Sequence, residues 1–239
     1  MIDDFIAHWS MDEASGSDVG DETGDHNATA HGTTIIDPGK ISKARNFNGS
    51  SDYLDTGAFT PPSAGQSYFV WIKTSASGER GITCFNNGSP PGSTIDRSLR
   101  IVSNKLQFYI TNAAGSIGYR ATSADDVNTG SWIHVGGVFD GINIQTYING
   151  VANGSPVAAG GGYTGYGSPR FIIGSSRNDG NTSTTYFSGD IDDPRIYDRA
   201  LSADEVAELY AWPPNPSNRI GMFDPMLRPE AWFDSSAVN

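Results

Sequence analysis

The stretch FSGDIDDPRIYDRALSADEVAELY, residues 187–210, determines more of the expected fold than any other part of the chain. Its first half has the apolar pattern of a strand but contains an adjacent acidic pair, Asp192 and Asp193. Its second half opens with Ser202-Ala203-Asp204-Glu205, the sequence form of a capping box, and predicts a helix over residues 203–210. Carboxylates inside a strand are costly unless something neutralises them, and a bound cation is the simplest neutraliser.

Outside this stretch, alternating apolar and polar residues recur at short, regular intervals. In residues 142–148, Ile and Thr alternate with Asn, Gln and Tyr between two turn-forming pairs, Asp140-Gly141 and Asn149-Gly150. Similar patterns predict further strands over residues 68–73, 106–110, 133–139 and 171–174. This regular spacing predicts an all-β fold, a two-sheet antiparallel β-sandwich or jelly roll, with one short C-terminal helix.

The composition fits one such domain and argues against some partners. A chain of 239 residues with 29 Gly and 18% charged residues is long enough for one large all-β domain. Its net charge of -12 argues against nucleic acid as a partner, because phosphate contacts need clustered Lys or Arg. The charge is compatible with divalent cations and neutral glycans, and a solubilising acidic surface is the alternative explanation.

We expect a sandwich over residues 1–211 and a Pro- and aromatic-rich C-terminal arm over residues 212–239. Trp212-Pro213-Pro214 ends any helix, and the aromatic content beyond it is high for a disordered tail. The arm either packs on its own domain or docks on a neighbour. The N-terminus has no basic segment or long apolar run, so we expect no signal peptide and no membrane insertion. Either the protein leaves the cell by another route, or this is an excised domain.

Three blocks of sequence together resemble the LamG-like jelly roll of the laminin-G-like, concanavalin A-like lectin/glucanase superfamily. The blocks are AHWSMDEASG (7–16) with DETGDHN (21–27), WIHVGGVFDG (132–141) with YING (147–150), and residues 189–210. The resemblance covers residues 5–211 and implies two packed antiparallel sheets, one of them curved. The sequence departs from the family at Pro194, where a branched apolar residue is usual. Because proline removes a ladder donor, we expect a bulge or a sheet edge there.

The resemblance also implies a structural calcium ion where the N-terminal acidic loop meets the Asp-Asp strand. Carried over by position, its ligands would be Asp21 and Asp192, with Asp25, Asn27 or a nearby carbonyl completing the shell. The residue types agree, because hard oxygen donors without Cys or a His pair suit Ca²⁺. Strict alternation along the strand points Asp192 inward. The alternative is a solvated Asp-rich turn, with Asp192 held by backbone N–H groups.

Catalysis has to be weighed, because the superfamily contains glycoside hydrolases. Their retaining members carry a Glu-x-Asp-x-x-Glu or similar run, which supplies two carboxylates about 5 Å apart. The six Glu residues of this chain form no such run, and Glu205 and Glu208 belong to the expected helix. His134 lies among alternating core residues and is expected to be packed. We therefore expect that the protein is not an enzyme.

A saccharide site needs an aromatic platform beside planar polar groups. Tyr163 and Tyr166 of a glycine-rich loop meet the first need, and Asn87, Arg177 and Asn178 of polar loops are candidates for the second. Three tryptophans lie inside strand patterns and are expected in the core: Trp9, Trp71 and Trp132.

The sequence thus predicts a calcium-stabilised, non-catalytic lectin-like domain outside the cell. It would bind a glycan or cell-surface polysaccharide, or act as an adhesion module. The alternative prediction is a structural or decoration protein on the surface of a phage virion, where residues 212–239 attach it to other virion proteins. The missing export signal and the aromatic arm favour this alternative, because phage particles assemble in the cytoplasm. Both predictions can hold together.

Overall fold

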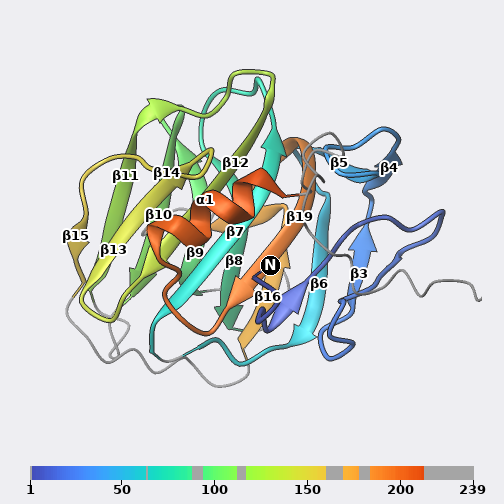
Figure 1. Cartoon of the computed structure of the whole chain (residues 1–239). Coiled ribbons are helices and arrows are strands. Elements are labelled where there is room, and N and C mark those ends of the chain that lie inside the picture. Colours follow the sequence, from blue (N-terminus) through green and yellow to red (C-terminus); the bar gives the residue numbers. More distant parts are fainter. Residues whose placement is uncertain are drawn as a thin grey trace, which may run out of the picture.

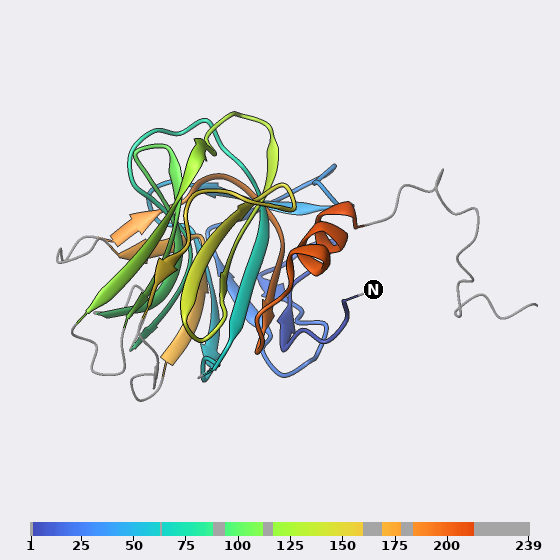
Figure 2. The same ribbon diagram turned by 60° about the vertical axis from the view of Figure 1, so that its left-hand side comes forward.

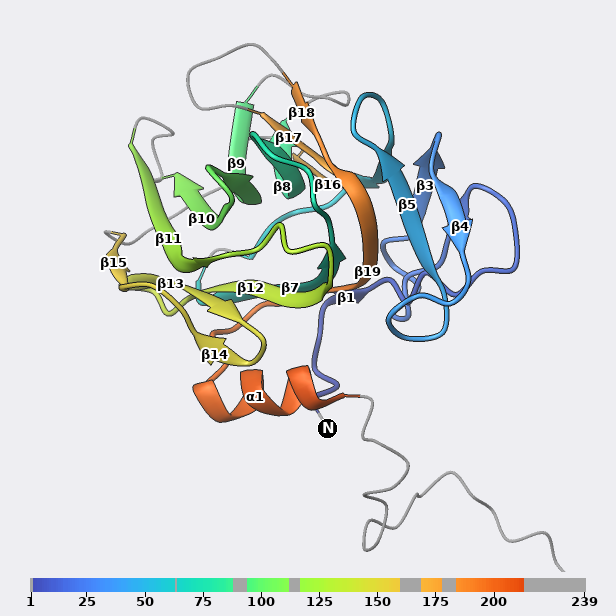
Figure 3. The same cartoon turned by 90° about the horizontal axis from the view of Figure 1, so that it is seen from above.

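The computed structural model describes residues 2–62, 64–87, 94–111, 117–159, 169–177 and 184–212. In this part of the chain, the strands form two large antiparallel sheets that face each other, with one helix on the outside (Figure 1, Figure 3). The all-β sandwich with a C-terminal helix is therefore confirmed. None of the helical structure in the described ranges is long and apolar enough to cross a membrane. Apart from Trp212, the predicted C-terminal arm lies outside the described residues.

One layer, called the front sheet below, carries the helix. Its strands are β1 (Ala7–His8), β4 (Thr34–Ile36), β5 (Ala44–Asn48), β7 (Gln66–Lys73), β12 (Trp132–Phe139), β13 (Asn143–Ile148), β14 (Val151–Ala152), β15 (Val157–Ala158) and β19 (Ser188–Tyr197). They follow the order β14-β13-β12-β7-β19-β5-β4, with β1 paired to β19 and β15 paired to β13. The first and last thirds of the chain therefore meet in this sheet.

The facing layer is called the back sheet. Its strands are β2 (Asp18–Val19), β3 (Ala28–His31), β6 (Tyr53–Ala58), β8 (Arg80–Asn87), β9 (Thr94–Val102), β10 (Lys105–Thr111), β11 (Gly118–Asp126) and β16 (Pro169–Ile173). Their order is β11-β10-β9-β8-β16-β6-β3-β2, and a separate hairpin joins β17 (Ser175–Arg177) to β18 (Thr184–Tyr186). The five strands predicted from alternation are confirmed as β7, β10, β12, β13 and β16.

The core lies between the sheets and consists of every second residue of the facing strands. On β7, Val70 and Ile72 face this core, whereas Trp71 faces outward. Trp9 is fully buried in the core, as expected, and stacks on Phe171 with ring centroids 5.4 Å apart. Trp71 is also buried, at 3% exposed, but it packs on the outer side of the front sheet and not between the sheets. The prediction of a core position is wrong for Trp132, which is half-buried on that outer face. Alternation alone does not distinguish two faces that are both partly covered.

Helix α1 (Ala203–Ala211) covers part of that outer face (Figure 2). Val206 and Leu209 are buried in a second apolar cluster, which also contains Phe69 of β7 and Ile2 of the N-terminal segment. The predicted capping box is confirmed, because the backbone N–H of Glu205 donates to the Ser202 hydroxyl at 3.3 Å. The Glu205 carboxylate accepts from the Ser202 N–H at 2.8 Å.

Replacing Ser202 by alanine is expected to lower the free energy of unfolding by about 1 kcal/mol, because the first helical turn loses its side-chain acceptor. Urea denaturation followed by circular dichroism measures this change. The matched control is Ser17→Ala on an exposed loop, which is expected to change stability by less than about 0.5 kcal/mol. Equal losses in the two variants would contradict a role for the cap.

Candidate functional site

The acidic pair on β19 lies where the pairing of this strand with β7 is interrupted. The paired residues skip from Asp192 to Arg195, so that the two residues between them form a bulge. Asp193 has a φ of 55° there, and Pro194 has no N–H to offer to the ladder. The bulge expected from Pro194 is confirmed. The expected inward direction of Asp192 is wrong, because Ile191 takes the core side and Asp192 takes the outer side.

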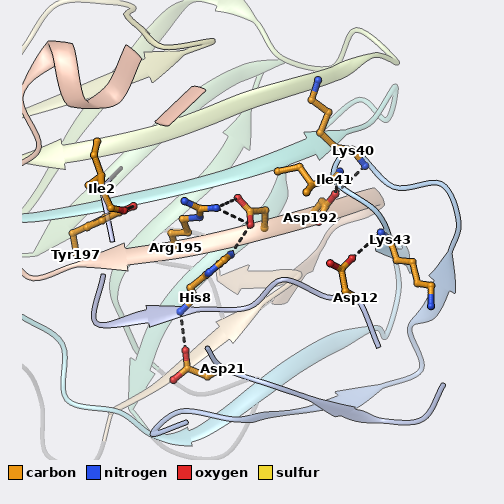
Figure 4. A network of polar contacts seen from close by, with 11 residues as sticks. Ile2, His8, Asp12, Asp21, Lys40, Ile41, Lys43, Asp192, Arg195 and Tyr197 are labelled. Atoms are coloured by element: carbon orange, nitrogen blue, oxygen red, sulfur yellow. Dashed lines mark hydrogen bonds and ion pairs between the residues drawn. The ribbon is translucent and has the colours of Figure 1, made fainter. Parts of the chain in front are cut away.

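Although it faces away from the core, Asp192 is fully buried, because the loop before β5 covers it. Its Oδ2 accepts hydrogen bonds from the backbone N–H groups of Lys40 and Ile41, both at 2.8 Å (Figure 4). Its Oδ1 is buried without a hydrogen-bond partner. Burial raises the pKa of Asp192 to about 7, against the lowering effect of the two backbone donors, and the neighbouring charge of Asp193 adds to the rise.

Asp193 has a different environment, because two cationic or polar side chains surround it. Nε2 of His8 donates to Oδ1 of Asp193 at 2.5 Å, and Nη2 of Arg195 lies 3.0 Å from Oδ2 and 3.1 Å from Oδ1. Asp193 and Arg195 are both 6% exposed. Burial by itself raises the pKa of Asp193, but the His8 hydrogen bond and the Arg195 charge together lower it. This carboxylate is therefore neutralised by the protein itself.

Asp21 fastens the N-terminal loop instead of meeting Asp192. Its Oδ1 accepts from the backbone N–H of His8 at 2.8 Å (Figure 4), and its Oδ2 accepts from the backbone N–H of His26 at 3.1 Å and from the Thr23 hydroxyl. The Asp21 N–H donates to the side-chain oxygen of Asn27 at 2.9 Å. Both oxygens of Asp21 and that of Asn27 are thus used within the protein.

The structure does not gather the four predicted calcium ligands into one group. Asp25 is exposed, and Asp21 and Asp192 anchor different loops. Within the described ranges, no group of three or more His, Cys, Asp or Glu side chains is arranged to hold a metal ion. The predicted four-residue shell does not fit this arrangement. The alternative, in which backbone N–H groups hold Asp192, matches the observed contacts. Of the two oxygens of Asp192, Oδ1 is the one without a hydrogen-bond partner.

The predicted saccharide residues are described only in part. Tyr163, Tyr166 and Asn178 lie outside the described residues. Asn87 and Arg177 end strands β8 and β17 rather than lying in loops, and their side chains are outside the description. The sequence prediction for this site therefore stays a prediction.

Sequence reasoning missed an open pocket of about 570 Å³ on the outer side of the front sheet, at the ends of β5, β7 and β19. Its lining is mostly polar and comprises Asn46, Phe47, Asn48, Lys73, Thr74, Ser75, Ala76, Gly130, Ser188, Gly189 and Asp190. These residues come from four separate segments of the chain. Only the register between the strands brings them together, and a single sequence does not reveal that register.

His134 on β12 is packed, as the sequence predicts. Its ring lies 5.4 Å from that of Phe69 and 5.0 Å from that of Trp71, and the residue is 3% exposed. Burial lowers the pKa of His134 to about 3, so the imidazole is neutral at physiological pH. A buried, neutral ring between two aromatic side chains stabilises the outer face of the sheet.

Two facing antiparallel sheets with an outer helix and a polar rim pocket define a lectin-like jelly-roll domain. A family model described as the concanavalin A-like lectin/glucanases superfamily matches residues 48–207, more than half of the chain. The chain belongs to this superfamily. No curated protein matches the chain in a sequence comparison.

Solved structures with a similar fold include domain 4 of AbnA, a GH43 extracellular arabinanase from Geobacillus stearothermophilus, in complex with arabinotriose. The TM-score is 0.66 at 22% identity, over 86% of this chain and 98% of that domain. The binding domain of Paraclostridial Mosquitocidal Protein 1 gives a TM-score of 0.66 at 15% identity, and the match covers 87% of this chain and 52% of that domain. The binding domain of botulinum neurotoxin DC in complex with SialylT gives a TM-score of 0.65 at 14% identity, and the match covers 88% of this chain and 51% of that domain. The chain thus spans about half of each toxin domain.

Proposed function

We propose that this protein is a non-catalytic module that binds a glycan. The observation that carries the proposal is the extent of the match to the arabinanase domain, which the chain covers over 98% of its length. That domain was solved in complex with arabinotriose, and a toxin binding domain, of which this chain covers 51%, was solved in complex with SialylT. The arabinanase complex supports the proposal most directly, because that domain has about the same extent as the sandwich of this chain. The proposed location is extracellular or on a virion surface.

Three carboxylates of the described residues, those of Asp192, Asp193 and Glu205, do not suit glycoside hydrolysis. Hydrolysis by the usual mechanism needs two carboxyl groups on either side of a bound sugar. The adjacent pair Asp192 and Asp193 is 0% and 6% exposed, and both residues have partners within the protein. Glu205 is held by the helix cap and by Arg199 at 2.8 Å, which lowers the pKa of Glu205 to about 2. These groups act in structure rather than in proton transfer.

We also propose that the sandwich takes up a calcium ion at Asp192. The spare Oδ1 of this residue supports the proposal, because a buried carboxylate oxygen without a hydrogen-bond partner needs a proton or a cation. The other oxygen stays with the loop that contains Lys40 and Ile41. The ion would be structural, since it would fasten this loop to β19.

Attachment to a phage virion stays an alternative prediction. It depends on residues 212–239, nearly all of which lie outside the described part of the chain. The alternative is compatible with glycan binding, because the sandwich would bind the glycan and the arm would attach the protein to the virion. Co-sedimentation of the full chain with purified virions tests it.

On an array of neutral and charged polysaccharides, the full chain is expected to bind at least one glycan saturably and to release no reducing sugar from it. Fluorescent labelling of the protein measures binding, and a reducing-sugar assay after prolonged incubation measures hydrolysis. Heat-denatured protein is the control for non-specific adsorption. Release of reducing ends above that control would contradict the non-catalytic proposal, and binding to no glycan would contradict the lectin-like proposal.

A further inference from the structure

Four polar or aromatic residues form one row across the outer face of the front sheet. Trp132 of β12 pairs with Lys73 of β7, Lys73 pairs with Asp190 of β19, and Asp190 pairs with Asn46 of β5. Residues directly opposite each other on neighbouring strands project to the same side of a sheet. This cross-strand row projects outward, because its sequence neighbours lie in the inter-sheet core: Ile133, Ile72, Ile191 and Phe47.

Three members of the row also line the polar pocket, and their contacts leave hydrogen-bonding capacity for a ligand. Asn46 Nδ2 donates to Asp190 Oδ1 at 2.6 Å, which fixes the carboxylate. Lys73 Nζ lies 3.7 Å from Asp190 Oδ2, too far for a direct hydrogen bond. The ammonium group and this carboxylate oxygen can therefore both bond to one hydroxyl placed between them. The Lys73 side chain is 45% exposed and accessible from solvent.

The chemistry of these groups suits an uncharged saccharide. A sugar hydroxyl donates one hydrogen bond and accepts others, so adjacent hydroxyls match a carboxylate beside an amide and an ammonium group. The opposite charges of Lys73 and Asp190 offset each other, which removes the attraction that an anionic sugar would need. Half-buried Trp132 continues the row beyond Lys73 and offers an apolar face beside the polar groups.

The rim of the pocket is already fixed by the backbone. Thr74 donates from its hydroxyl to the Ser188 carbonyl at 2.6 Å and accepts at its carbonyl from the Gly130 N–H at 2.8 Å. Gly189 has a φ of 136°, and a Cβ there would lie 2.3 Å from the Lys73 carbonyl oxygen. Only glycine permits this close approach. A rim set before binding lowers the ordering cost of a ligand, and a volume of 570 Å³ is typical of small-molecule pockets.

We propose that this pocket, with Asp190, Asn46 and Lys73 as its polar contacts and Trp132 at its edge, is the binding site for an uncharged saccharide. The inference rests on the proposed glycan-binding function and gives it a location. It differs from the glycine-tyrosine loop site expected from the sequence, which is on other segments of the chain.

Native electrophoresis in gels that contain soluble arabinan, galactan, xylan, β-glucan or mannan tests the proposal, with polygalacturonate as the charged probe. The full chain is compared with Asp190→Asn, which keeps the shape of the side chain, and with the exposed-site variant Lys73→Gln. The matched control is Asp126→Asn, which alters another Lys–Asp pair, Lys105 Nζ to Asp126 Oδ1 at 2.7 Å, on the edge of the back sheet. Thermal melting verifies that each variant is folded.

We expect at least one neutral polysaccharide to retard the wild-type chain and the control. Asp190→Asn is expected to weaken binding about ten- to a hundredfold, because a hydrogen bond to a charged acceptor is lost. Equal retardation of all four proteins would overturn the location while leaving glycan binding intact. Retardation of the wild type by polygalacturonate alone would overturn the choice of an uncharged ligand. Retardation by no polysaccharide would overturn both the proposed function and this inference.

Discussion

Asp193→Ala is expected to lower the free energy of unfolding by about 3–5 kcal/mol, because the substitution leaves Arg195 buried without its counter-charge. Arg195 is 6% exposed, and its closest acidic oxygens are those of Asp193, at 3.0 and 3.1 Å. The same change removes the acceptor that lies 2.5 Å from Nε2 of His8. Because His8 belongs to β1 and Arg195 to β19, the pairing of these two strands is expected to weaken as well.

Urea denaturation at pH 7 measures this loss, and a second Asp–Arg pair provides the matched control. Asp4 Oδ2 lies 2.5 Å from Arg199 Nε, but the two side chains are 55% and 36% exposed. Exposed pairs of this kind contribute less than about 1 kcal/mol, so Asp4→Ala is expected to cost far less than Asp193→Ala. Similar losses in both variants would mean that burial does not determine the strength of the Asp193 network.

The contribution of Asp193 is also expected to depend on pH in a defined direction. Its pKa is lower in the folded protein than in the unfolded chain. The stabilisation is therefore complete above the unfolded pKa and is lost as the pH falls through the folded pKa. The difference between wild type and Asp193→Ala should shrink on acidification below about pH 4.

The contribution of Asp192 to stability is expected to depend on pH in the opposite direction, and Asp192→Asn should remove this dependence. The folded pKa of Asp192 is about 7 against an ordinary value of 3.8, so the folded state keeps a proton that the unfolded chain releases in this range. In calcium-free buffer, wild-type stability should therefore fall as the pH rises from 4 to 7, by about 1.4 kcal/mol per pKa unit of difference at most. The asparagine has no charge to desolvate, and its side-chain oxygen can still accept from Lys40 and Ile41.

Melting temperatures at pH 5 and pH 8, with EDTA or with added calcium, measure both the ionisation and the proposed ion. At pH 8 without calcium, Asp192→Asn should melt above the wild type, and the advantage should be clearly smaller at pH 5. Added calcium should raise the melting temperature of the wild type but not that of the variant. Parallel pH curves for the two proteins would exclude a buried ionisation at Asp192. A wild type that does not respond to calcium or EDTA would exclude the ion.

The fold was predictable because its signals are local. Alternation over residues 142–148 and the Ser202–Glu205 capping box each act within a few residues of chain, and both predictions are confirmed. The bulge at Pro194 was also predictable, because the missing N–H is a property of one residue. The direction of the Asp192 side chain was not predictable, because one extra residue in a strand reverses the alternation between the two faces.

The candidate site was less predictable, because its contacts join distant segments. Asp192 is held by backbone N–H groups about 150 residues earlier in the chain. The sequence does not mark such donors, because every residue except proline has a backbone N–H. Both carboxylate oxygens of Asp21 accept hydrogen bonds from backbone N–H groups of the N-terminal segment. Likewise, Asn46, Lys73 and Asp190 form part of a row only through the register of three strands, and that register depends on the whole sheet.

The apolar cluster that joins Ile2 to Leu209 places both ends of the described sandwich on one flank of the molecule. The polar pocket, our proposed saccharide site, opens on the outer face of the same sheet that carries this flank. If either end were tethered to a larger structure, the face with the pocket would lie toward that structure and the back sheet toward the solvent. Access for a large polymer would then depend on the length of the tether, whereas a short oligosaccharide would reach the pocket in either case.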